Sequence, residues 1–463
     1  MKTVICLCAF TVFVCLLGCG GDVDRARPTQ SQAPANPSVS LATESVEVTA
    51  AEYRGWQALR MSNGLVTLIA VPDIGGRIME YKLNGHPFLW TNPEEYGRTY
   101  DPPRTESERV WHNFGGYKVW PAPQSEWRGP GDPVGSALDG GKWTGEIVRA
   151  TGQVGEIRLT SPPDPDVTGL QITRTVRLYS GGTRVEVAET FSNVSDRDIH
   201  WSVWDVTQVP GSLASNSSAD EESRIYFPLN PSSKHPNGYV KLIEDPAGDA
   251  QWEVLKDEGL MRVSYQGQAG KIGADSRAGW IGHVDEIHNM AFVKRFEVAK
   301  LQEHPDQGST VEVYTSGPPL SYMEVEVLSE LIPLKPGESH TVTREWCAAA
   351  TPGPLLDVGE IAAINQPLAT AEADGKLKLT GTFGVFSEGK AVLSPADEEG
   401  RAKDELLTFP ASPVAPLAIQ EQLDRPKGAT LLVLDLRNAN GSPVGRIASV
   451  RLPEEPQVAA APE

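Results

Sequence analysis

The chain has 463 residues, of which 61 are acidic and 41 are basic, and its formal charge at pH 7 is −20. A surface with this balance repels nucleic acid and anionic lipid headgroups, so we expect neither as a partner. The length is ample for one or two large hydrophobic cores.

The first residues predict an exported protein. Lys2 is followed by an apolar run from residue 4 to residue 17, then by Gly18 and Cys19, which is the order of a secretory signal. The run is shorter than the about 20 apolar residues that span a bilayer. Its last four residues, Leu-Leu-Gly-Cys, resemble the bacterial lipobox, which implies cleavage after residue 18 and lipidation of Cys19. An ordinary secretory signal with a nearby cut is the alternative.

The anchor determines the expected compartment. We expect a lipoprotein of the cell envelope, held on the periplasmic side by its lipid alone. Glycines at positions 20 and 21, with no aspartate directly after Cys19, favour the outer membrane over the inner one. Four of the five cysteines lie within the first 19 residues, which leaves Cys347 without a partner for an internal disulfide.

Most of the chain is patterned as β-strands. Residues 1–18 form the signal, and residues 19–48, rich in Pro, Ser and Ala, are expected to be a disordered tether. In 49–352, apolar residues alternate with polar ones at 170–178 and at 185–191, around a Ser-Gly-Gly-Thr turn. The same alternation recurs at 311–313 and 323–327. These patterns predict an all-β body of large antiparallel sheets.

A second, smaller unit is expected at 353–452. Short strands at 376–380, 389–393 and 430–436 lie among Pro- and Gly-rich turns, a pattern that suits a small β-sandwich. We expect residues 355–375 to form a short helix or a linker. The tail, 453–463, is expected to be disordered.

Two segments carry a resemblance to a known superfamily. They are Asn63 to Gly85, which contains Pro-Asp-Ile-Gly-Gly-Arg-Ile, and Trp111 to Gln124, which contains Gly-Gly-Tyr-Lys-Val-Trp-Pro. The first resembles the opening of galactose-mutarotase-like proteins, and the second is similar to the segment that lines the sugar site in hexose-6-phosphate epimerases. Over residues 50–350 the chain most resembles an uncharacterised bacterial family of that superfamily. The resemblance implies a β-supersandwich whose concave face takes a monosaccharide.

Tryptophans mark the expected sugar site. Seven of the eleven fall between residues 90 and 204, and indole faces cover the apolar C–H side of a pyranose while polar neighbours satisfy its hydroxyls. The alternative for any one of them is a place in the sandwich core. The side chains that we predict to bind substrate are Arg77, His112, Lys118, Trp120, Gln124, Trp127 and Trp204.

Carboxylates supply the candidate catalysts. Epimerisation at an anomeric carbon needs a base and an acid, which the resemblance implies are a glutamate and a histidine. Glu324 and Glu326 lie two residues apart on one expected strand and therefore share a face; a pair of exposed strand carboxylates is the alternative. Trp204 stands where the histidine is expected, so standard mutarotation is in doubt. Asp205, His112 and Lys118 are the candidate substitutes for the acid.

The ligand expected from these residues is a neutral sugar. In the hexose-phosphate enzymes an arginine precedes the Gly-Gly, whereas Phe114 stands there in this chain, which favours an unphosphorylated ligand. No phosphate loop or zinc spacing is visible, so we predict no cofactor and no metal. The leading hypothesis is a carbohydrate-binding lipoprotein. The alternatives are an aldose 1-epimerase-like isomerase and a structural interaction protein of the envelope.

Overall fold

The computed structural model describes residues 45–100, 112–127, 136–211, 223–243, 251–299 and 303–453. The expected signal, the expected lipidation site Cys19, nearly all of the tether and Trp111 lie outside these residues, as does most of the tail. Within the described ranges, helical structure is limited to single turns. These are η1 (Pro72–Ile74), η2 (Pro93–Glu95), η3 (Gln124–Glu126), α1 (Ser136–Asp139) and α2 (Pro305–Gly308).

The first large sheet has thirteen strands among the described residues, and its pairs are antiparallel. In spatial order they are β14 (Val240–Ile243), β17 (Gly270–Ala274), β20 (Val311–Thr315), β21 (Tyr322–Leu328), β12 (Ile199–Pro210), β6 (Tyr117–Ala122), β4 (Arg77–Leu83), β3 (Val66–Val71), β2 (Trp56–Ser62), β1 (Val46–Tyr53) and β8 (Thr151–Gly152), with β22 (Ile332–Leu334) beside β12 and β5 (His86–Pro87) beside β4.

The second large sheet has ten described strands and is also antiparallel. Its order is β15 (Trp252–Leu255), β16 (Leu260–Ser264), β13 (Ser223–Pro228), β18 (Trp280–Asp285), β19 (Met290–Phe296), β23 (Ser339–Ala350), β11 (Val185–Asn193), β10 (Leu170–Tyr179), β9 (Val154–Thr160) and β7 (Thr144–Arg149). The predicted hairpin is its β10–β11 pair, in which Leu178 is opposite Val185.

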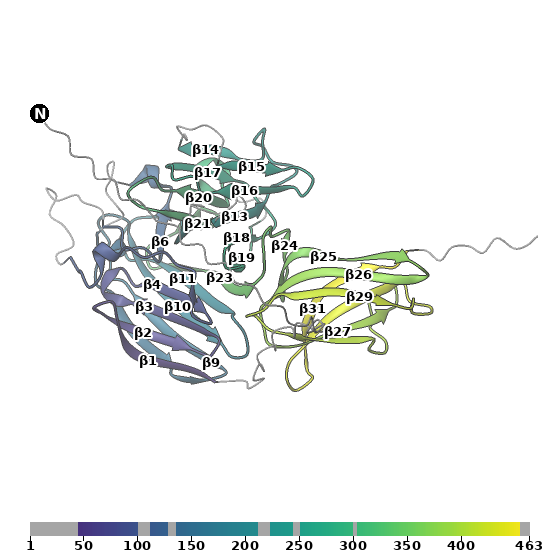
Figure 1. Ribbon diagram of the computed structural model, residues 1–463. Helices are drawn as coiled ribbons and strands as arrows, with labels where there is room; N and C mark the ends of the chain where they lie inside the picture. Colours follow the sequence, from purple (N-terminus) through teal and green to yellow (C-terminus); the bar gives the residue numbers. More distant parts are fainter. Residues whose placement is uncertain are drawn as a thin grey trace, which may run out of the picture. The chain divides into compact units, whose positions relative to one another are not determined.

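The two large sheets stack face to face over one hydrophobic core. Leu68, Val119 and Val325 of the first sheet lie in the same buried cluster as Ile172 and Phe292 of the second. Period-two burial explains the arrangement, because each strand turns alternate side chains toward this core. In β10, every second side chain from Leu170 onward is buried. The predicted fold class, an all-β antiparallel supersandwich, is confirmed (Figure 1).

Two smaller sheets follow along the chain, drawn in green and yellow in Figure 1. One contains β24 (Asp357–Val358), β25 (Ala362–Ala373), β26 (Lys376–Val385) and β29 (Leu417–Leu423); the other contains β28 (Leu407–Ala411), β27 (Gly389–Ala396), β30 (Leu431–Arg437) and β31 (Pro443–Arg451). They share a core of their own, so the expected small β-sandwich is present. The expectation of a helix or linker at 355–375 is wrong: β25 pairs with β26 along most of this stretch.

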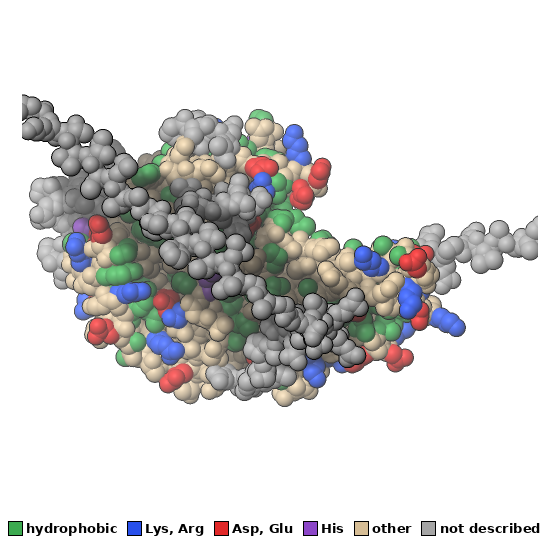
Figure 2. Space-filling model, in the orientation of Figure 1, with side chains coloured by type: hydrophobic (Ala, Val, Ile, Leu, Met, Phe, Trp, Pro, Cys, Tyr) green, Lys and Arg blue, Asp and Glu red, His purple; other side chains and the backbone are tan. Residues whose placement is uncertain are grey.

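Charged side chains show no segregation by sign on the face drawn in Figure 2. Outside the grey atoms, Lys and Arg alternate with Asp and Glu over the surface. None of the described helices is long and apolar enough to cross a membrane.

Candidate functional site

A pocket lies across six neighbouring strands of the first sheet, β6, β12, β21, β20, β17 and β14. Register explains why they contribute to it. Trp120 of β6 is opposite Trp204 of β12, and Glu324 of β21 is opposite Tyr314 of β20. Because successive side chains of a strand point to opposite faces, their neighbours Val119 and Val325 face the second sheet. Asp205, which is opposite Val119, contacts Lys294 of that sheet. The site is therefore built on the sheet face that turns away from the inter-sheet core.

The pocket has a volume of about 260 Å³. Of the ten side chains predicted to bind or catalyse, six line it. The lining residues are Lys118, Trp120, Gln124, Trp127, Trp204, Ile243, Lys271, Tyr314, Tyr322 and Glu324. The structure thus brings the Trp-rich loop and the carboxylate strand together at one hollow.

Three indoles, of Trp120, Trp127 and Trp204, form a cluster at this pocket, here called the tryptophan trio. The ring centroids of Trp120 lie 5.3 Å from Trp127 and 5.4 Å from Trp204, both edge to face. Each indole N–H is used: Trp120 donates to Asp139 at 2.9 Å, Trp127 to the Pro121 carbonyl at 2.9 Å, and Trp204 to Glu326 at 2.5 Å. These bonds fix the ring orientations. Trp120 and Trp204 are buried, with 8% and 3% of their surface exposed, whereas Trp127 is only partly buried and offers the most accessible ring of the three to an apolar ligand face.

An ion pair accompanies the trio. Lys118 Nζ lies 3.5 Å from Glu324 Oε1 and 3.7 Å from the centre of the Trp120 ring. Gln208 Nε2 donates to the same Glu324 oxygen at 2.8 Å. Burial lowers the pKa of Lys118, and the Glu324 carboxylate acts against that shift. A carboxylate and an ammonium therefore face a hollow in which they are weakly screened.

A second group of charges consists of the lining residue Lys271 and two buried glutamates behind it. Lys271 Nζ lies 2.6 Å from Glu312 and 3.0 Å from Glu326, and it lies over the Trp204 ring at 4.4 Å. Burial acts to lower the pKa of Lys271, but the two carboxylates outweigh it and raise that pKa. Burial raises the pKa of Glu312 and of Glu326, with Lys271 acting in the opposite sense on both. Glu326 does not line the pocket; it is fully buried and holds the Trp204 indole.

The sequence of the domain matches one described family. The profile of a domain of unknown function (DUF4380) matches residues 56–349. The chain belongs to this family. The matched range contains the whole pocket and ends before the two small sheets, so in this DUF4380 protein the family's domain is the stacked pair of large sheets. The predicted family membership is confirmed.

Several solved structures are similar at low sequence identity. A galactose mutarotase-like protein from Clostridium acetobutylicum is 12% identical, with 66% of this chain and 99% of that one covered at a TM-score of 0.41. A putative aldose 1-epimerase from Escherichia coli K12 is 14% identical, with coverages of 66% and 99% and a TM-score of 0.40. A TPR-domain containing protein from Parabacteroides distasonis is 11% identical at a TM-score of 0.45; 66% of this chain matches 49% of that protein, about half its length. A search of curated proteins gave no match.

Three predicted site residues of the DUF4380 domain lie elsewhere. Arg77 is fully buried and donates to Asp139 at 2.7 Å, so it reaches the pocket only through the carboxylate that also holds Trp120. Burial lowers the pKa of Arg77, and Asp139 opposes the shift. His112 stacks on Tyr100 at 3.4 Å between ring centroids. Neither His112 nor Arg77 faces the pocket.

Asp205 is the third displaced residue, and its position differs from the one expected of a substitute acid. It follows Trp204 on β12, so the pleat turns it to the opposite face, between the sheets. There it is fully buried and accepts hydrogen bonds from Lys294 and from Arg344, the latter at 3.2 Å. This placement indicates a structural ion pair.

The sequence analysis missed four lining residues, Ile243, Lys271, Tyr314 and Tyr322. Tyr322 and Tyr314 could have been predicted from the strand alternation. Tyr322 precedes Glu324 by two residues and therefore shares its face, while Tyr314 directly follows the alternating run at 311–313 and shares the face of Glu312. Lys271 lies in a five-residue strand next to the edge strand β14, where no local pattern signals a site.

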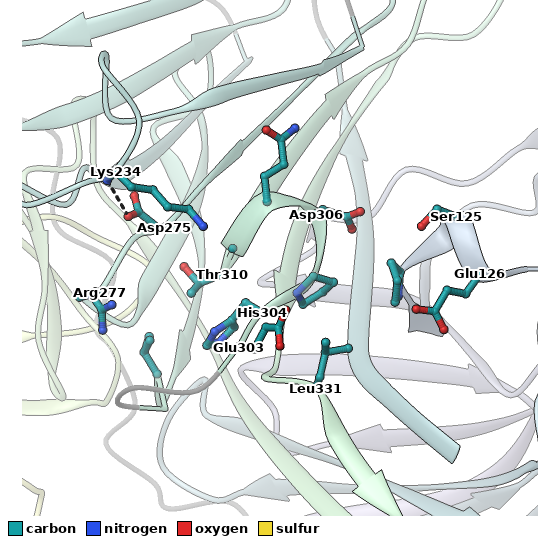
Figure 3. A pocket seen from close by; sticks show the side chains of 15 residues that line it. Ser125, Glu126, Lys234, Asp275, Arg277, Glu303, His304, Asp306, Thr310 and Leu331 are labelled. Carbon is teal, nitrogen blue, oxygen red and sulfur yellow. Dashed lines mark hydrogen bonds between the residues drawn. The ribbon is translucent and has the colours of Figure 1, made fainter. Parts of the chain in front are cut away.

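Two other cavities lie on the body. Figure 3 shows one of about 550 Å³, into which Lys234, Glu303 and Asp306 project beside His304. The described residues that line it include no Trp, Tyr or Phe. Another, of about 700 Å³, is lined by side chains that already pair with one another, such as Arg295 with Glu345 at 2.6 Å. Of the three cavities, the pocket at the tryptophan trio combines ring surface with a buried charge pair.

Proposed function

We propose that the pocket at the tryptophan trio binds one neutral, unphosphorylated sugar ring. The observation that supports this most is the set of three indoles whose N–H groups are all engaged by protein acceptors. Their orientation is fixed before a ligand arrives, which reduces the entropy cost of binding. The C–H face of a pyranose stacks on such rings, and Glu324, Lys118 and Gln124 meet its hydroxyls.

The size and the charges of the pocket restrict the class of ligand that it can bind. A volume of about 260 Å³ falls just below the roughly 300 Å³ at which pockets for drug-sized ligands begin, so a single ring suits it. Lys118 and Lys271 are each paired with carboxylates, of Glu324 in one case and of Glu312 and Glu326 in the other. With both ammonium groups neutralised, a phosphate dianion gains little attraction here.

Calorimetry with a panel of monosaccharides and short oligosaccharides tests the proposal. Trp127 is only partly buried, so Trp127→Ala removes ring surface without opening the core. We expect this variant and Glu324→Gln each to weaken sugar binding by at least about tenfold, which corresponds to 1.4 kcal/mol. His340→Ala, on the exposed part of β23, is the matched control and should bind as the wild type does. Absence of binding to every sugar by folded protein would refute the proposal.

A second candidate is epimerisation of an aldose, favoured by one observation. Lys118 and Glu324 form a buried ammonium–carboxylate pair at the pocket, which supplies one candidate acid and one candidate base, and burial lowers the pKa of Lys118. Polarimetry on freshly dissolved glucose and galactose separates the two functions. A rate above the buffer control that falls in Lys118→Met and Glu324→Gln would support catalysis, and a rate equal to buffer would leave binding alone.

We also propose, from the sequence alone, that Cys19 anchors the protein to the cell envelope, on the periplasmic side and in the outer membrane. The apolar run before Cys19 and the lipobox-like segment support this. Labelled palmitate should enter the wild-type protein and not Cys19→Ser. An equal label in both, or none in either, would contradict the anchor.

A further inference from the structure

Two histidines and an aspartate meet at the end of the β18–β19 hairpin, away from the sugar pocket. His86 belongs to β5, Asp285 ends β18, and His288 lies in the turn before β19. Asp285 Oδ2 lies 2.8 Å from His288 Nδ1 and 3.7 Å from His86 Nε2. One donor atom from each of the three residues lies within 4.8 Å of the other two.

Backbone hydrogen bonds fix the orientation of the Asp285 carboxylate. Asp285 Oδ1 accepts hydrogen bonds from the backbone N–H groups of Ile287 and His288, both at 3.1 Å. These bonds fix the carboxylate plane, so Oδ2 is the oxygen left to face the two imidazoles. Such a hydrogen bond to the second oxygen is what orients a carboxylate that ligates a metal.

The imidazoles are placed by different means. His86 packs edge to face on Phe88 with ring centroids 5.0 Å apart, and its side chain is 18% exposed. His288 is 62% exposed, so its ring is free to adjust, and its centroid lies 5.2 Å from that of His86. The group therefore combines one fixed imidazole, one fixed carboxylate and one adjustable imidazole.

We propose that His86, Asp285 and His288 bind a divalent transition metal ion of the zinc type. Two imidazole nitrogens and one carboxylate oxygen form a donor set that Zn²⁺ and Ni²⁺ prefer, whereas Ca²⁺ and Mg²⁺ prefer oxygen ligands alone. In a tetrahedral site with bonds of 2.0–2.1 Å, neighbouring donors are separated by about 3.3 Å. The two separations from Asp285 Oδ2, 2.8 Å to His288 Nδ1 and 3.7 Å to His86 Nε2, lie on either side of that spacing. The exposed side of the site leaves the fourth position to water.

The site would join the two large sheets. His86 lies on β5 of the thirteen-stranded sheet, and Asp285 ends β18 of the ten-stranded sheet. An ion held by both is bound by the folded protein and not by the unfolded chain, because the ligands are far apart in sequence. Metal binding is therefore expected to stabilise the fold by mass action. The distance in sequence between His86 and the other two ligands also explains why the sequence analysis predicted no metal site, because metal-binding motifs are recognised by ligands within one short segment.

Calorimetry with ZnCl₂ and NiCl₂ on untagged, EDTA-treated protein is the test. We expect one ion per chain, a loss of affinity of more than about tenfold in His288→Ala and in Asp285→Asn, and no change in His200→Ala. His200 is a matched control because it is 57% exposed and pairs with Glu126 at another place. The exposed position of His288 makes its alanine variant safe for folding.

Thermal unfolding gives an independent readout. Zn²⁺ should raise the unfolding midpoint of the wild type and leave that of His288→Ala unchanged. Co²⁺ should give visible absorption bands in the wild type that the same variant lacks. No uptake by the wild type, or equal uptake by His288→Ala and the wild type, would overturn the proposal and leave a hydrogen-bonded His-Asp-His group.

Discussion

Replacing Asp205 with Asn tests whether this carboxylate is structural or catalytic. Its oxygens accept hydrogen bonds from Lys294 of β19 and Arg344 of β23, so the carboxylate of the first sheet holds two cations of the second. Asp205 and Lys294 are fully buried, and the Arg344 side chain is 4% exposed. Asparagine keeps the shape but removes the charge, and its amide can place N–H donors against these cationic donors.

The expected loss of unfolding free energy in Asp205→Asn follows from these contacts. Removing one partner of a buried ion pair leaves an uncompensated charge and costs about 3–5 kcal/mol. Lys294 retains one other acceptor, the Val325 carbonyl at 2.9 Å, which places the expectation nearer the lower end of that range. Glu146→Gln is the control, because Glu146 pairs with Arg158 at 3.4 Å with both side chains exposed, and such pairs contribute less than about 1 kcal/mol.

Urea unfolding followed by tryptophan fluorescence measures the difference. All eleven tryptophans precede residue 347, so the signal reports on the large sheets and not on the small ones. Sugar binding is measured on the same samples. A variant with wild-type stability and no sugar binding would refute the structural assignment and return Asp205 to the catalytic site.

Three further predictions follow from burial and backbone geometry. Because burial raises the pKa of Glu312 in the folded protein, the wild type should lose stability as the pH rises from about 4.5 toward that raised value. The difference in urea unfolding free energy between Glu312→Gln and the wild type should therefore shift in favour of the variant as the pH rises above about 5, and a difference that does not change with pH would contradict the raised pKa. Gly116 has φ +71°, and a Cβ there would lie 2.4 Å from the Ile78 carbonyl oxygen, whereas Gly85 has φ +87° and nothing within 4 Å of a Cβ. Backbone strain should lower the unfolding free energy of both alanine variants by about 1–3 kcal/mol, and the additional clash should make Gly116→Ala the less stable of the two. Unfolding curves of both variants test this, and equal losses would contradict it. Cys347 is buried, and burial raises the pKa of its thiol. A thiol reagent should therefore label Cys347 in urea and not in buffer. Rapid labelling of the folded protein would contradict this packing.

The strand patterns predicted the large sheets because alternation is a local property. The hairpin at 170–191 and the pair Glu324 and Glu326 on one face could both be read from period two. The pattern did not predict how deeply each side chain is buried. Glu326 is fully buried because it contacts Trp204 of the adjacent strand β12 and Lys271 of β17, which lies two strands away. That covering depends on which strands pair, which the sequence does not state.

The predictions that failed, for β25, Lys271 and Asp205, failed for the same physical reason. β25 contains five Ala together with one Pro and one Asn, residues that have low strand propensity, and its pairing with β26 outweighs that preference. Lys271 joins the site because β17, β20, β21, β12 and β6 are neighbours in the sheet although they are scattered along the chain. Asp205 lies in β12, where polar and apolar residues do not alternate regularly and nearly every side chain is buried, so the pattern does not indicate which face Asp205 takes.

The placement of Asp205 also bears on how the pocket is specified. Trp204 and Asp205 are consecutive on β12 and face opposite sides of the sheet. A slip of β12 by one residue would exchange those faces, putting the carboxylate at the pocket and the indole between the sheets. Lys294 and Arg344 would then lose their buried acceptor, so the slipped register is strongly disfavoured. We infer that the inter-sheet ion pair helps to select the register that presents Trp204 to the pocket, although no member of the pair lines it.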